Sequence, residues 1–186
     1  VTVCFIKNPR WVLHHLGEYP FFIKRYSMKL DLKSSPRHIK RLQNIAKVIS
    51  GLGDVRVVID DNTKGPYFDP VNKVCVLPNG DYSDDDFVSL IEGFTCHEAG
   101  HGRYTVSEVY SDAFNSVLMS SEGFTRFDDG MNAEFESLAE KRKAYSRAKR
   151  LTGLINLFDD VQMEEKVGND YPDAKRRLAA TYALMV

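Results

Sequence analysis

The segment Phe94-Thr95-Cys96-His97-Glu98-Ala99-Gly100-His101-Gly102 decides most of what can be expected of this chain. It holds two histidines four residues apart, with a glutamate directly after the first. Residues four apart lie on the same face of an α-helix, so both imidazoles would reach one metal ion. Glu98 would point towards the same region. The spacing therefore predicts a helix with His97 and His101 as metal ligands.

The residue types in this segment suit hydrolytic zinc chemistry. Imidazole nitrogens bind Zn²⁺ at about 2.0–2.1 Å, and a catalytic zinc takes three protein ligands and leaves a fourth position to water. The bound water's pKa falls to about 7, which makes hydroxide available at neutral pH. Glu98 could accept the proton of this water and pass it to a leaving amine. The H-E-x-x-H pattern is typical of zinc-dependent hydrolases, and it predicts Glu98 as the general base.

An apolar stripe precedes the motif on the same helical face and consists of Phe87, Leu90, Ile91 and Phe94. Glu98 and His101 continue this stripe, and His97 lies at its edge. Polar groups that face the interior are costly unless they are paired, and a metal ion would satisfy them. A solvated helix end with two surface histidines is the alternative, but it leaves the continuity of the stripe unexplained.

Composition limits the other functional classes. The 186 residues are 43% hydrophobic, enough for one core, and we expect a single domain over residues 1–186 with an N-terminal extension over 1–34. The 25 basic and 26 acidic side chains leave no basic footprint for nucleic acid or an anionic membrane. No apolar run approaches the roughly 20 residues that span a bilayer. Three cysteines without a C-x-x-C motif favour a reducing, cytoplasmic setting. The chain lacks an initiator methionine and ends within an apparent helix, so we expect it to be part of a longer protein.

The apolar periodicity and the turn residues predict an α+β fold that is mostly helical, with a small sheet beside the motif helix. Ser83 is the expected N-cap of the motif helix. The expected strands cover residues 54–60 and 73–77, the expected helices cover 34–50, 84–102, 106–119, 132–145, 147–167 and 172–186, and residues 121–130 are expected to form a loop.

A third metal ligand is expected from the segment Asn156 to Glu165. Two arrangements are open: Asp159 is the ligand, or Asp160 is the ligand and Glu164, one helical turn later, orients a histidine or an adjacent cation. A stripe that we expect to be buried runs beside these acids and consists of Leu151, Leu154, Ile155, Phe158 and Val161. An ordinary acidic helix face is the alternative.

These motifs, together with Leu77-Pro78 and Tyr104-Thr105, resemble a metallopeptidase-like region of phage and bacterial proteins related to the cobaltochelatase CobT subunit. The resemblance covers roughly residues 37 to 175, and it matches Asn156, Asp159, Asp160 and Glu164 to the later family segment. Asp159 stands where the family usually has glutamate, and Gln162 stands where it has arginine. The resemblance implies a zincin-like, gluzincin-like fold. It also implies an ATPase partner or a von Willebrand A-type domain.

Two functions follow as expectations. The first is a zinc metallopeptidase that acts on a peptide or protein substrate, in which the 73–77 strand pairs with an extended peptide. Tyr104, Tyr110 and Tyr171 are the candidate oxyanion donors. The second is an adaptor of an ATPase-associated complex, in which the metal site is structural or vestigial.

Overall fold

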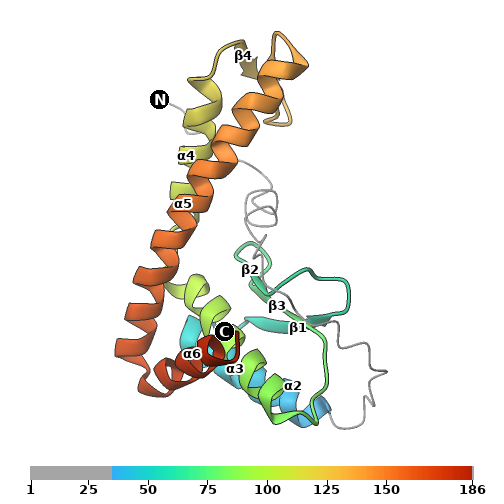
Figure 1. Ribbon diagram of the computed structural model, residues 1–186, viewed down its shortest axis with the longest axis vertical. Coiled ribbons are helices and arrows are strands. Elements are labelled where there is room, and N and C mark those ends of the chain that lie inside the picture. Colours follow the sequence, from blue (N-terminus) through green and yellow to red (C-terminus); the bar gives the residue numbers. More distant parts are fainter. Residues whose placement is uncertain (1–34, 186) are drawn as a thin grey trace. The chain divides into compact units, whose positions relative to one another are not determined.

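The computed structural model describes residues 35–185, and their contacts form two compact units that Figure 1 shows in sequence colours. Residues 35–105 with 160–185 form the motif unit, and residues 106–159 form the hairpin unit. The expected N-terminal extension, residues 1–34, lies outside the described residues. The described chain is mostly helical with small sheets, which confirms the α+β expectation. Among residues 35–185, no helix combines the length and the apolar character needed to cross a membrane.

The motif unit contains a three-stranded sheet in the order β1-β3-β2. β1 (Arg56–Asp60) runs parallel to β3 (Val74–Pro78), and β2 (Tyr67–Asp69) runs antiparallel to it. The sequence did not predict β2, because its three residues lie in a stretch rich in turn formers. Since β3 is the central strand, both of its edges are already paired. The expected pairing of a peptide with the 73–77 strand is therefore wrong, and β1 and β2 are the outer strands.

α3 (Asp85–Tyr104) is the central helix of the motif unit. It packs against α2 (Ser35–Ser50), α6 (Pro172–Met185) and the sheet. The core between these elements includes Leu42 of α2, Leu77 of β3, Ile91 of α3 and Leu178 of α6. Fully burying one such side chain contributes about 1.5–3 kcal/mol. Cys75 and Cys96 are free thiols that pack in this core.

The start of α3 differs from the prediction by one residue. The side chain of Asp84 caps the helix, because it accepts hydrogen bonds from the backbone N–H groups of Asp86 and Phe87. Ser83, the expected cap, donates instead to the carboxylate of Asp81 at 2.6 Å. Both side chains can cap a helix, and a carboxylate is also stabilised by the positive end of the helix dipole.

The hairpin unit contains α4 (Ser107–Met119), a two-stranded antiparallel hairpin and the first part of α5 (Leu138–Asp170). The hairpin consists of β4 (Phe124–Phe127) and β5 (Ala133–Phe135), where we expected a loop and the start of a helix. Phenylalanine rings explain the difference, because Phe124 meets Phe127 and Phe135 edge-to-face at centroid distances of 5.2 and 5.8 Å. Phe124 and Phe127 both lie on β4, whereas Phe124 and Phe135 form a cross-strand pair, and such a pair stabilises a short hairpin.

α5 is one continuous helix of 33 residues, and the predicted break before Pro172 is confirmed. The expected burial of its large apolar stripe is wrong, because Leu151, Leu154, Phe158 and Val161 are exposed. Smaller or more flexible side chains face the neighbouring elements instead: Ala144, Ala148, Thr152, Met163 and Val167. Close helix packing favours such residues at the contact, and the larger ones are left on the opposite face.

Candidate metal centre

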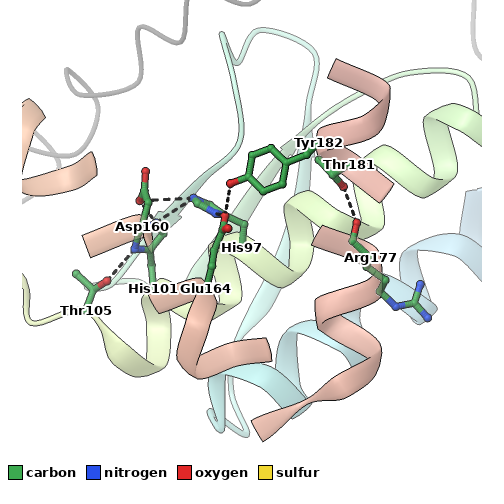
Figure 2. Close-up of polar contacts among 8 residues, drawn as sticks. All are labelled: His97, His101, Thr105, Asp160, Glu164, Arg177, Thr181 and Tyr182. Atoms are coloured by element: carbon green, nitrogen blue, oxygen red, sulfur yellow. Dashed lines mark hydrogen bonds and ion pairs between the residues drawn. The ribbon is translucent and has the colours of Figure 1, made fainter. Parts of the chain in front are cut away.

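Three side chains of the motif unit converge on one point, as Figure 2 shows. The Nε2 atoms of His97 and His101 lie 3.2 Å apart. Oδ1 of Asp160 lies 3.2 Å from His101 Nε2 and 3.7 Å from His97 Nε2. α3 contributes both histidines and α5 contributes the aspartate. All three side chains are partly buried.

These distances can be compared with those of a zinc site. Two ligand atoms that each lie 2.0–2.1 Å from a tetrahedral zinc are about 3.3–3.4 Å apart. The three distances between His97, His101 and Asp160 fall close to this value. Two imidazoles and one carboxylate also match the usual donor set of a catalytic zinc with three protein ligands. The group can hold a metal ion, and its dimensions fit zinc.

A second layer of contacts orients both imidazoles. His97 Nδ1 lies 2.7 Å from Glu164 Oε1, and His101 Nδ1 lies 2.7 Å from Thr105 Oγ1. With its proton on Nδ1, His97 donates a hydrogen bond to the Glu164 carboxylate, and the lone pair of Nε2 is directed at the centre. Tyr182, on α6, donates its hydroxyl to Glu164 Oε1 at 2.7 Å. A chain of two hydrogen bonds therefore links α6 to His97, as seen in Figure 2.

The geometry favours one of the two arrangements expected for the third ligand. Asp160 lies beside the histidines, and Glu164 contacts a histidine rather than a neighbouring cation. Asp159 precedes Asp160 on α5 and is grouped with the hairpin unit. Its part in metal binding stays a prediction.

Gly100 explains how α5 can bring Asp160 so close to α3. A Cβ atom at this position would lie 2.9 Å from Val167 Cγ2 and would also meet Met163 Sδ. Real Cβ atoms do not approach other atoms this closely, so the two helix backbones can approach each other here only because Gly100 has no side chain. Asp160 lies one turn before Met163 and Glu164 on the same helix. Gly100, inside the motif, therefore allows Asp160 to lie beside His97 and His101.

Glu98 is almost completely buried on the same helix. Burial raises the pKa of its carboxyl group, and the nearby His97 and His101 act in the opposite direction. The carboxylate also accepts a hydrogen bond from the backbone N–H of Phe68 in β2. A buried carboxylate with a raised pKa, held beside a metal group, is what a general base for bound water requires.

The three tyrosines proposed as oxyanion donors have other contacts. Tyr104 donates to Asp170 at 2.5 Å, and Tyr171 lies beneath the guanidinium of Arg103 at 5.8 Å. Tyr110 is buried and belongs to the hairpin unit. Sequence reasoning missed Tyr182, because it lies in the last helix, far from the motif in the chain. Sequence spacing gives no signal for such a contact.

The chain was compared with protein-family models, with curated proteins and with solved structures, and none of the three comparisons found a match. The function is therefore inferred from the residues of the candidate metal centre.

Proposed function

We propose that this chain is a zinc-dependent metallopeptidase domain that hydrolyses peptide bonds. The observation that carries the proposal is the convergence of His97, His101 and Asp160 beside the buried carboxylate of Glu98. A structural zinc site usually has four protein ligands, whereas three ligands leave one position open for water. A structural site also needs no buried base next to its ligands.

The protein groups have separate parts in the proposed reaction. His97, His101 and Asp160 would hold the zinc ion, which lowers the pKa of bound water and polarises the peptide carbonyl. Glu98 would take the proton from the water and deliver it to the leaving amine. Glu164 and Thr105 would keep the imidazoles in the required orientation.

The first test is metal content. Zinc per chain should be close to one in the wild type and should fall to near zero in His97→Ala and Asp160→Asn. Asp159→Asn is the matched control, because it makes the same chemical change one residue earlier and is expected to keep zinc. Equal zinc in the wild type and in Asp160→Asn would overturn the proposed ligand set.

The second test separates the enzyme from the adaptor function. Glu98→Gln should retain zinc and lose cleavage of denatured casein and of a mixture of unstructured peptides. Glu108→Gln, an exposed position on α4, is the control and should cleave normally. An adaptor related to the CobT subunit would show no zinc-dependent cleavage in the wild type. That result would contradict the proposed peptidase activity without affecting the metal site.

A further inference from the structure

The exposed apolar residues of α5 form a regular pattern. Leu151, Leu154, Phe158 and Val161 are 38%, 57%, 68% and 63% exposed, and we call these four residues the α5 seam. Their spacing of three, four and three residues places them along one face of the helix. This spacing is that of the contact positions in paired helices. Large apolar side chains gathered in this way on a surface indicate an interaction site.

Charged residues occupy the next position of the same pattern at each end of the seam. Arg147 lies four residues before Leu151, and Glu165 lies four residues after Val161; both are exposed. The other charged side chains of α5 are divided in the same way, with basic residues towards its start and acidic residues towards its end. Residues 141–150 contain six basic and no acidic side chains, whereas residues 159–170 contain five acidic and one basic. This distribution opposes the preference of the helix dipole, which favours acids at the N-terminus and bases at the C-terminus.

We propose that the α5 seam binds the α5 seam of a second copy of this chain, with the two helices antiparallel. We place the two-fold axis at the level of Asn156. Each residue of one helix then faces the residue of the other helix that lies the same number of positions on the opposite side of Asn156. Leu151 then faces Val161, and Leu154 faces Phe158. Arg147 faces Glu165 at both ends of the contact, because a two-fold interface repeats every pair.

The charges select this direction and this partner. A parallel pair would place Arg147 against Arg147 and Glu165 against Glu165, which is repulsive. An antiparallel pair places the basic half of each helix against the acidic half of the other. It also sets the two helix dipoles antiparallel, which is the favourable arrangement. The complementarity lies within one helix, so an identical helix supplies all that the seam requires.

Charge reversal tests the proposal on the full chain by sedimentation equilibrium over a range of concentrations. The wild type should dimerise, and Arg147→Glu and Glu165→Arg should each raise the dissociation constant roughly tenfold or more, because each turns two attractive contacts into repulsive ones. The double variant Arg147→Glu/Glu165→Arg should recover most of the affinity. Lys149→Glu, an exposed charge reversal away from the seam, should leave the dissociation constant unchanged.

Phe158→Asp is the second variant, and its helix content by circular dichroism should match the wild type, because Phe158 is exposed. It should be monomeric at concentrations where the wild type is dimeric. A monomeric wild type would overturn the proposal, and so would a dimer that survives Phe158→Asp. A double charge variant that is no tighter than the single ones would overturn the antiparallel pairing. A monomeric wild type would leave residues 1–34 or another protein as the occupant of the seam.

Discussion

Two glutamates on α3, Glu92 and Glu98, are equally buried but have different surroundings. Each is only 4% exposed. Glu92 forms ion pairs with Arg41, at 2.6 Å, and with Arg177, so two guanidinium groups compensate its charge. Glu98 accepts one backbone N–H and lies near two imidazoles and a second carboxylate. Burial alone therefore does not distinguish the two acids, whereas the position of Glu98 near the three candidate metal ligands does.

The difference matters because an isolated buried charge is unstable. Arginine brings a permanent positive charge, and the triad of Glu92, Arg41 and Arg177 ties α3 to α2 and α6. Further along α3, a metal ion would supply a positive charge near Glu98 and Asp160. The ion pairs of Glu92 thus link helices, whereas we propose that the surroundings of Glu98 bind a metal ion.

The largest expected effect is stabilisation by zinc at the proposed metal centre near Glu98. A ligand that binds only the folded state stabilises it by about 4 kcal/mol when its free concentration is a thousand times its dissociation constant. Thermal unfolding with zinc and with a chelator should show this difference in the wild type. Asp160→Asn should lose most of it, and Glu92→Gln should keep it. Equal zinc effects in the two variants would contradict the distinction between the surroundings of Glu92 and those of Glu98.

Gly100→Ala should destabilise the protein by about 1–3 kcal/mol, because the added methyl group meets Val167 and Met163. The same change should weaken zinc binding, since it separates α5 from α3. Gly153→Ala is the matched control on α5, where a Cβ atom meets nothing within 4 Å. It should raise the free energy of unfolding by up to about 1 kcal/mol, because alanine favours helix. Urea unfolding and zinc titration measure both effects.

Glu92→Gln should lower the stability of the metal-free protein, and Glu98→Gln should not. The first leaves Arg41 and Arg177 without a carboxylate and should cost about 1–3 kcal/mol. The second removes a carboxyl group whose pKa is raised by burial. Such a group adds stability at low pH and loses it as the pH rises through its folded-state pKa, so Glu98→Gln should be neutral or stabilising at neutral pH. A loss of stability in Glu98→Gln as large as that in Glu92→Gln would show that both acids are structural.

The smallest expected effect concerns Tyr182. Removing its hydroxyl frees one side of Glu164, so Tyr182→Phe should weaken zinc binding about tenfold, at the lower end of the range for outer partners of metal ligands. Glu164→Gln should weaken it by the same amount or more. Tyr145→Phe, in the hairpin unit, should leave zinc affinity unchanged. Competition with a chromogenic chelator measures the zinc affinity. An unaltered affinity in both Tyr182→Phe and Glu164→Gln would show that these two residues do not contribute to zinc binding.

The sequence alone predicted the parts of the centre that lie within one helix. His97, Glu98 and His101 occupy one turn of α3, and their relative positions follow from helix geometry. The break between α5 and α6 and the mixed α+β character were also local, since proline and apolar periodicity indicate them. The short β2 strand and the β4–β5 hairpin were missed, because pairing and ring packing with other segments stabilise them.

Contacts between distant segments were decided by the tertiary structure. Asp160 and Asp159 are equal candidates by composition, and the close approach of α5 at Gly100 is what puts Asp160 beside the histidines. Tyr182 reaches the centre through Glu164 for the same reason, although the sequence gives it no motif. The burial of α5 could not be predicted from its largest apolar residues, because closely packed helices buried the smaller or more flexible ones and left the seam exposed. Helix geometry is fixed by the local chain, whereas the partner of each helix face depends on how the whole chain packs.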